Sequence, residues 1–366
     1  MNNKPGIKIR PATLGDFEAI DRVRKRNDLA SIPRDEWTHI HSQHPLVEYP
    51  DSQIGWVLVT QEGEIVGVHE SIRLAYEFDG KPVAVACSSS FAVNPDHRHA
   101  SALLMAKFFA QRDIDLFIAT TANEASGTVW QIHRGQTVPG PYDEVAMWVT
   151  RPVGFASAAL RLKNIPGVRL AGPIAGTALA LRRLARGPSE AQAKRHPDVQ
   201  EVTSFDRRFD EFWQTLRSTR RRLMAPRSAT CLSWHFAHSF KRGGVCLAIV
   251  RNDRIEGYAF FRRNDCNDIG LRRLQMVDLQ LENENASEAR LLIEAALDLA
   301  KRQNVHLVEA YGFCAEKHGL FSNLAKDQRR FPFPLFFYRT KKTDLSFDVD
   351  DAAIWDPAPY DGDGGF

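Results

Sequence analysis

The chain has 366 residues, and a hydrophobic content of 43% is enough to build the cores of two or three domains. Its 48 lysines and arginines almost balance its 45 aspartates and glutamates, so the overall charge argues against a nucleic-acid-binding protein. The five cysteines are scattered and form no CxxC pair, which argues against a disulfide framework and against a zinc site.

The N-terminal stretch MNNKPGIKIRPATLGDF lacks the apolar segment that a signal peptide needs. No hydrophobic run approaches the length of a membrane-spanning helix. We therefore expect a cytoplasmic protein without a membrane span, and nothing in the sequence indicates its oligomeric state.

The first 150 residues predict a mixed sheet with flanking helices. Thr13 is a suitable N-cap for a helix that carries Phe17, Ile20 and Val23 on one face. The turn sequences QEGE and DGK separate strand-like runs, and a further helix precedes the last strand. The predicted strands are residues 7–10, 55–60, 64–78, 83–93 and 115–122.

The bend VNPDHRHAS, residues 93–101, connects the strand 83–93 to that further helix. Pro95 ends the strand, and Leu104 and Phe108 are four residues apart, as on one face of a helix. The free N–H groups of the first helical turn, with Arg98 beside them, suit a phosphate group. A polar connection that binds nothing is the alternative.

Residues 151–203 are rich in Ala, Leu, Arg and Gly, and they predict a helical linker. The stretch 175–186 is basic and amphipathic, which is typical of a weak contact with a membrane surface. A helix packed between two domains is the interpretation that we prefer.

The pattern of the first half then starts again in residues 204–345. GGVCLAIVRNDRIEGYAFFRR predicts a hairpin, LRRLQMVDLQL a strand, SEARLLIEAALDLAKRQ a helix and VHLVEAYG a final strand, so we expect a duplicated architecture. The acidic, Gly- and Pro-rich segment 346–366 indicates a disordered tail, although Trp355 and Tyr360 suggest that part of it docks.

The first half resembles the GCN5-related N-acetyltransferase (GNAT) superfamily, in which a Val-x-Pro-x-x-Arg-x-x-Gly pattern opens the helix that binds the pyrophosphate of coenzyme A. Val93, Pro95 and Arg98 match this pattern, and Ser101 replaces the glycine. After the next strand the family often places an asparagine and an aromatic residue. The resemblance implies that an acyl-CoA, for example acetyl-CoA, is held by these residues: Val93, Arg98, His99, Ala100, Ser101, Ala102, Asn123 and Trp130.

The second half resembles the same superfamily, in particular tandem-domain members associated with surface-polysaccharide biosynthesis. Its strand LQMVDLQL leads into ENENASEAR, which has neither the proline nor the arginine and glycine of a pyrophosphate loop. We therefore expect an α+β protein of two GNAT-like mixed-sheet domains, of which the second is degenerate as a cofactor site.

Acyl transfer to an amine needs a base, and the glutamate that the family often carries on strand four is absent here. Glu70 and His69 on the preceding strand are our candidates for this base; a raised pKa would let Glu70 accept a proton near neutrality, and His69 could do so without much adjustment. We expect the acyl group and its acceptor near Ser89 and Ser90, with Asp278 polarising the acceptor; exposed positions for Glu70, His69 and Asp278 are the alternative.

The function we expect is N-acyl transfer from an acyl-CoA to an amine of a small molecule or a nucleotide-linked sugar, without a metal and without nucleic acid. The resemblance implies acetyl-CoA as the donor. A non-catalytic tandem protein that binds or assembles components of a polysaccharide pathway is the first alternative. Aminoacyl transfer from charged tRNA, with RSTRRR at 217–222 contacting phosphate, is the second.

Overall fold

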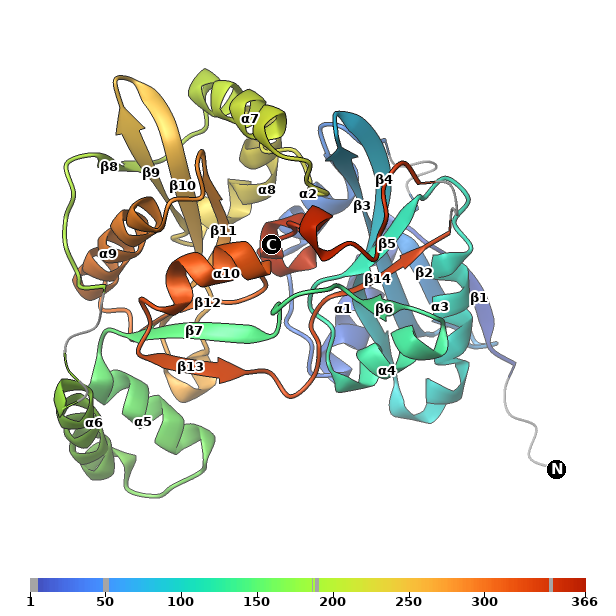
Figure 1. The fold of residues 1–366 in the computed structure, drawn as a ribbon. Helices are drawn as coiled ribbons and strands as arrows, with labels where there is room; N and C mark the ends of the chain where they lie inside the picture. Colours follow the sequence, from blue (N-terminus) through green and yellow to red (C-terminus); the bar gives the residue numbers. More distant parts are fainter. Residues whose placement is uncertain (1–5, 49–52, 186, 188–190, 342–344) are drawn as a thin grey trace.

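The structure is a computed structural model that describes residues 6–48, 53–185, 187, 191–341 and 345–366. Within these residues, fourteen strands form two mixed sheets of seven strands, and helices cover both sheets. The two sheets lie side by side in Figure 1, one in each half of the molecule. The predicted α+β class with two similar mixed-sheet domains is confirmed.

The first sheet combines an antiparallel meander with a parallel crossover. Its strands, in spatial order, are β1 (Lys8–Ala12), β2 (Gly55–Val59), β3 (Ile65–Phe78), β4 (Lys81–Val93), β5 (Leu116–Ala119), β14 (Phe337–Thr340) and β6 (Gln136–Thr137). Strands β1 to β4 are antiparallel neighbours, whereas β4 and β5 are parallel. The helix α3 (Ser101–Phe109) connects β4 to β5, as a parallel pair requires.

The second sheet repeats this arrangement. Its strands, in the equivalent spatial order, are β8 (Val199–Val202), β9 (Val245–Arg251), β10 (Arg254–Arg263), β11 (Arg273–Leu281), β12 (Leu307–Ala310), β7 (Glu144–Val149) and β13 (Asp327–Arg330). Strands β11 and β12 are parallel and correspond to β4 and β5. The duplicated architecture that the sequence predicts is therefore present.

Each sheet takes its sixth strand from the other half of the sequence. Phe337 of β14 lies opposite Ala119 of β5, and Val149 of β7 lies opposite Leu307 of β12. The two sheets therefore cross the boundary that we expected at residue 150. Sequence periodicity indicates which face of a strand is buried but not which strand it pairs with, so it does not reveal this exchange.

Helices cover both faces of each sheet. Ile20, Val23 and Trp37 pack on one face of the first sheet, and Leu104 and Phe108 pack on the other. The helices of the first half are α1 (Phe17–Arg26), α2 (Arg34–Ser42), α3 and α4 (Glu124–Ile132). Those of the second half are α7 (Arg207–Thr219), α8 (Ala229–Lys241), α9 (Ala286–Arg302) and α10 (Ala315–Ser322).

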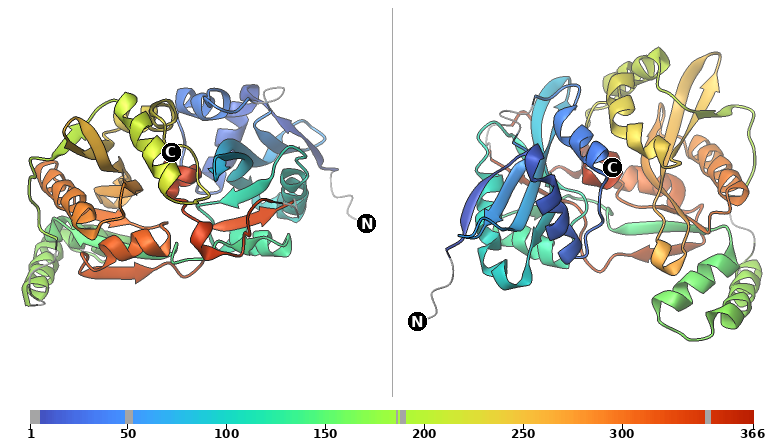
Figure 2. Two further views of the ribbon diagram at one scale, coloured as in Figure 1. Left: turned by 45° about the horizontal axis from the view of Figure 1, so that its top comes forward. Right: turned by 180° about the vertical axis from the view of Figure 1, so that it is seen from behind.

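The linker forms a helical hairpin of α5 (Pro152–Leu162) and α6 (Val168–Ala185). All views in Figures 1 and 2 show this hairpin beside the second sheet, at the end of the molecule far from the first sheet. The hairpin does not lie between the two halves, so our preferred interpretation, a helix packed between two domains, is wrong. Residue 186, the last of the stretch 175–186, lies outside the described residues.

The C-terminal segment is packed between the halves. Trp355 is 2% exposed, Tyr360 is 4% exposed, and both belong to a core cluster that also contains Tyr76 of the first sheet and Tyr258 of the second. Figure 1 shows the C-terminus at the centre of the molecule. A disordered tail is therefore the wrong interpretation of the segment's composition, and the docking that Trp355 and Tyr360 suggested is observed.

Candidate active site

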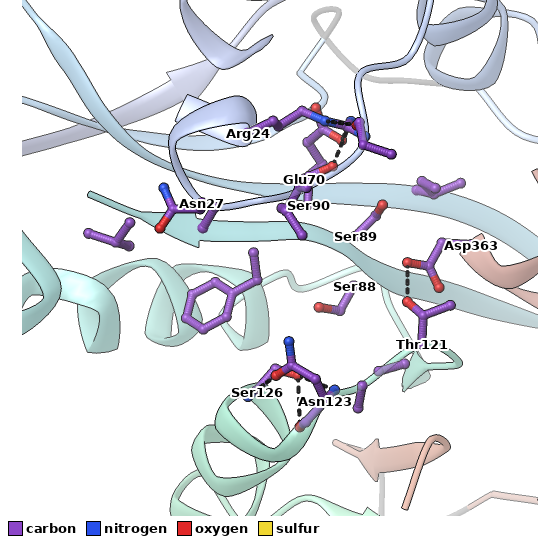
Figure 3. A pocket seen from close by; sticks show the side chains of 18 of the residues that line it. Arg24, Asn27, Glu70, Ser88, Ser89, Ser90, Thr121, Asn123, Ser126 and Asp363 are labelled. Atoms are coloured by element: carbon purple, nitrogen blue, oxygen red, sulfur yellow. Dashed lines mark hydrogen bonds and ion pairs between the residues drawn. The ribbon is translucent and has the colours of Figure 1, made fainter. Parts of the chain in front are cut away.

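The parallel strands β4 and β5 diverge in the middle of the first sheet. Their pairing ends at Cys87 and Ile118, although β4 continues to Val93. A register shift between β3 and β4 accompanies the divergence, and Ser90 lies in the bulge with a left-handed φ of 47°. A cavity of about 620 Å³ opens at this point, and Figure 3 shows its polar lining.

Most of the predicted site residues meet at this cavity. It is lined by the following predicted residues: Glu70, Ser89, Ser90, Val93, Arg98, Ser101, Asn123 and Trp130. The remaining predicted residues do not line it: His69, His99, Ala100, Ala102 and Asp278. Residues between 70 and 130 thus converge because the crossover brings the end of β4, the start of α3 and the end of β5 to one edge.

The predicted helix start lies at one end of the cavity. A 3₁₀ turn, η3 (Pro95–Ala100), leads directly into α3 at Ser101. No side chain of the described residues caps α3, and the N–H group of Ser101 donates to the carbonyl oxygen of Arg98 in the preceding turn. The exposed Arg98 side chain and the positive end of the helix dipole are therefore what this helix start offers to an anion. The local sequence therefore predicted the geometry of this connection correctly.

A second helix also starts at the cavity. The N–H group of Ser126 donates to Asn123 Oδ1 at 2.9 Å, and the N–H group of Asn123 donates to Ser126 Oγ at the same distance. Asn123 therefore fixes the start of α4, as Figure 3 shows. Trp130 is 1% exposed and packs against Phe109 with ring centroids 5.1 Å apart, so its main role is in the core.

Glu70 reaches the cavity from the α1 and α2 side of the sheet. Trp37 Nε1 donates to its Oε1 at 2.7 Å, and its Oε2 lies 3.6 Å from Arg24 Nη1 and 3.6 Å from His41 Nε2. Burial alone would raise the pKa of Glu70, but His41, Arg24 and Ser90 outweigh it and lower the pKa to about 2. The raised pKa that Glu70 would need to act as a base near neutrality is therefore absent, and Glu70 is a firmly ionised carboxylate.

His69 points to the opposite face of the sheet. Its ring lies between Phe91 and Phe108, with centroids 4.8 and 4.5 Å away, and its Nε2 is 2.8 Å from Ser88 Oγ. Complete burial lowers the pKa of His69 to about 3, so the ring is neutral near pH 7. The geometry does not support His69 as the base, because successive side chains of a strand face opposite sides and Glu70 is the one that reaches the cavity.

Asp363, which our sequence reasoning did not select, also lines the cavity. The hydroxyl groups of Thr120 and Thr121 donate to its two carboxylate oxygens at 2.9 and 2.7 Å. Burial raises the pKa of Asp363 above its ordinary value, against the lowering effect of these hydrogen bonds. A carboxylate with a raised pKa beside Ser89 and Thr121 has the properties of a general base. The docking of Trp355 and Tyr360 was the only signal pointing to this segment.

Comparison with known proteins identifies the fold. Models of protein families and curated proteins give no match. Among solved structures, N-myristoyltransferase from Saccharomyces cerevisiae with bound myristoyl-CoA has a TM-score of 0.59 at 14% identity, over 98% of this chain and 92% of that chain. A GCN5-related N-acetyltransferase from Anabaena variabilis ATCC 29413 has a TM-score of 0.53 at 12% identity, over 92% and 73%. A probable N-acyltransferase from Enterococcus faecalis V583 has a TM-score of 0.54 at 10% identity, over 92% and 72%. The chain has the two-domain GNAT fold.

The second half of this GNAT fold also contains diverging strands, but the chain itself fills the space. The parallel pairing of β11 and β12 ends at Met276 and Ala310. Beyond it, Arg227 joins Asp278 of β11 to Asp361 of the C-terminal segment through contacts of 3.2 and 2.5 Å, and all three side chains are fully buried. Asp278 is therefore neither exposed nor in the cavity, contrary to both of our expectations for it.

The same segment also contacts the helix after β12. Lys317 Nζ of α10 lies 2.9 Å from Asp356 Oδ1, and it donates to Gln280 Oε1 at 3.1 Å. Helix α10 is the equivalent of α4, so residues 356–361 occupy in the second half the position that the cavity occupies in the first. The C-terminal segment thus closes one site and contributes Asp363 to the other.

Proposed function

We propose that the protein is an N-acyltransferase that uses an acyl-CoA as donor and an amine as acceptor. The observation that carries the proposal is the divergence of β4 and β5 around a cavity that has a helix start at one end and Asp363 at the other. The fold of the N-acetyltransferases and N-myristoyltransferase supports it. The donor we propose is acetyl-CoA or another acyl-CoA, and we propose a cytoplasmic protein.

The residues around the cavity divide the work of binding. Arg98, beside the positive end of the α3 dipole, would hold the diphosphate of the donor through charge-assisted hydrogen bonds. Beyond Cys87, the edge of β4 has no partner on β5, so its backbone is free to pair with the amides of the pantetheine arm. This arrangement would place the thioester near Ser89 and Thr121.

Asp363 would then act as the general base. The amine nitrogen attacks the thioester carbonyl carbon, an amide bond forms, the C–S bond breaks, and coenzyme A leaves as the thiolate. The proton of the amine passes to the Asp363 carboxylate, whose raised pKa makes it a better acceptor. Cys87, whose thiol lies 3.9 Å from Asp363, is not a competing nucleophile, because burial raises its pKa and keeps it protonated.

Glu70 has a different role in this scheme. Its ionised carboxylate holds Trp37, Arg24 and His41 together and shapes the cavity wall opposite α3. We propose an acceptor amine on a small molecule or a nucleotide-linked sugar. The link to surface-polysaccharide biosynthesis rests on the sequence resemblance alone.

Calorimetric titration with acetyl-CoA, a long-chain acyl-CoA and free coenzyme A tests the donor site without knowledge of the acceptor. We expect saturable binding of at least one acyl-CoA, followed by release of coenzyme A when a panel of amines is added. Absence of binding to all three compounds would contradict the proposal. Binding without release of coenzyme A for any amine would favour the non-catalytic alternative.

A further inference from the structure

The helical hairpin of α5 and α6 has its large apolar side chains on the outside. Leu170 is 80% exposed, Ile174 72%, Leu181 61% and Leu184 74%. At about 100° per residue, these four side chains fall within an arc of about 80° on α6. We call this set the α6 stripe. The exposed Thr177 lies within the same arc, between Ile174 and Leu181, and the other large side chains in the arc are apolar. An exposed apolar stripe of this kind marks a contact surface.

The inner face of the hairpin explains why the stripe is exposed. Gly172 and Gly176 are buried, and a Cβ atom on either would overlap Ser157 or Val153 of α5. The two helices therefore approach each other through small residues, which leaves the large apolar residues of α6 on the opposite side. Because this packing is tight, the stripe cannot turn inward without separating the helices.

The charge of the segment is entirely of one sign. From Arg151 to Gly187 the sequence contains seven basic residues and no acidic residue. Arg169 and Arg182 lie about 100° to 120° from the centre of the stripe, one on each side. Arg183 points away from it and is paired with Asp327 of β13. The exposed surface is thus an apolar stripe between two basic edges.

We infer that the α5–α6 hairpin binds the surface of an anionic lipid bilayer. An apolar stripe with basic residues along its edges suits the boundary between acyl chains and anionic headgroups. None of the helices in the described part of the chain combines the length and apolar character needed to span a bilayer. The hairpin would therefore lie on the membrane, at the end of the molecule far from the candidate site (Figures 1 and 2).

A second copy of the chain is a less suitable occupant of this surface. Pairing two stripes about a twofold axis would bring the basic edges of both hairpins together, and like charges at a shared interface oppose association. A bilayer that contains anionic lipids instead offers charges of the opposite sign. The inference does not rest on the proposed acyl transfer, because it uses no residue of the cavity.

Cosedimentation of the full chain with vesicles tests the inference. We expect binding to vesicles of equal parts phosphatidylcholine and phosphatidylglycerol, at least about tenfold weaker binding to phosphatidylcholine alone, and weaker binding as salt is raised. A variant with Leu170→Gln, Ile174→Gln, Leu181→Gln and Leu184→Gln should lose at least about tenfold in affinity. Ile132→Gln is the matched control, since Ile132 is 73% exposed on α4.

A second pair of variants tests the inference even if the four substitutions in the α6 stripe disturb folding. Arg169→Gln with Arg182→Gln should weaken binding to anionic vesicles, whereas Arg112→Gln, an exposed arginine outside the hairpin, should not. No binding to anionic vesicles, or equal binding by the parent and both hairpin variants, would overturn the inference. Self-association that the stripe variant abolishes, without vesicle binding by the parent, would assign the surface to a second copy.

Discussion

At the scale of single residues, the cavity contains two carboxylates in opposite electrostatic environments. Glu70 faces His41 and Arg24, which lower the pKa of its carboxyl group to about 2 and so keep it ionised. Asp363 instead accepts hydrogen bonds from the hydroxyl groups of Thr120 and Thr121 and from the thiol of Cys87, and burial raises its pKa. Pairs of carboxylates whose pKa values are pushed apart in this way divide structural and proton-transfer roles between them.

Asp363→Asn should therefore lower kcat by about 100-fold or more, because the amide cannot accept the amine proton. Binding of acyl-CoA should change by less than about twofold, since the side chain lies away from the proposed diphosphate site. Steady-state kinetics together with calorimetry measure the two effects separately. Asp348→Asn, in the same segment but exposed, is the control. An unchanged kcat for Asp363→Asn would show that Asp363 is not the base.

His69 should make the protein less stable as the pH falls. Its pKa is about 3 in the folded state and about 6.5 when unfolded, so the unfolded chain binds the proton more readily throughout this range. The contribution of neutral, buried His69 to the free energy of unfolding is therefore fully present above about pH 6.5. This contribution falls on acidification, by about 2 kcal/mol between pH 7 and pH 5.

Replacing His69 with a group that does not titrate should remove this part of the pH dependence. The free energy of unfolding of His69→Phe, measured with urea at pH 7 and pH 5, should vary by about 2 kcal/mol less than that of the parent. His44 and His235 also have pKa values lowered by burial and contribute to both proteins equally. Identical pH dependence in parent and variant would show that His69 is not buried as described.

At the scale of elements, local sequence signals correctly predicted the features that depend on neighbouring residues, such as where a helix begins. Pro95 and the spacing of Leu104 and Phe108 placed the start of α3 within the bend, and α3 begins at Ser101. The resemblance to the GNAT superfamily, rather than any local signal, selected Ser89 and Ser90, which lie where β4 and β5 diverge. It left open whether His69 or Glu70 faces the cavity; because a strand sends adjacent side chains to opposite faces, only one of them can, and it is Glu70.

The remaining features depend on contacts between residues far apart in the chain. Asp363 is 243 residues from Thr120, to which it is hydrogen-bonded, and β14 reaches β5 from the other half of the sequence. The pKa of Glu70 is set by Arg24 and His41, which belong to two different helices. Propensity and periodicity carry no information about such partners, so these parts of the site required the structure.

Arg98→Ala tests the helix start as a diphosphate site. Each charge-assisted hydrogen bond contributes about 1.5 to 3 kcal/mol, so the variant should bind acyl-CoA at least about tenfold more weakly. Its melting temperature without ligand should be nearly unchanged, because Arg98 is exposed. Lys107→Ala, at the other end of α3, is the matched control. Equal affinities of Arg98→Ala and parent in calorimetry would contradict the assignment.

At the scale of the whole molecule, the two halves are joined in ways that make independent unfolding unfavourable. The sheets exchange β7 and β14, and one core cluster includes Ile118 of the first sheet and Phe260 of the second. The C-terminal segment adds a buried ionic network, in which Arg227 contacts both Asp278 and Asp361. We therefore expect a single cooperative unfolding transition for the chain.

Arg227→Met should lower the temperature of this single unfolding transition without splitting it into two. The substitution leaves two buried carboxylates without their cation, and loss of one partner of a buried pair costs about 3 to 5 kcal/mol. Because Asp361 anchors the segment that carries Asp363, acyl transfer should fall in parallel with stability. Arg254→Met is the control, since that side chain is 65% exposed and its contact with Glu282 is 3.8 Å long. Differential scanning calorimetry that resolved two transitions, with only the second half destabilised, would show that the exchanged strands do not couple the halves.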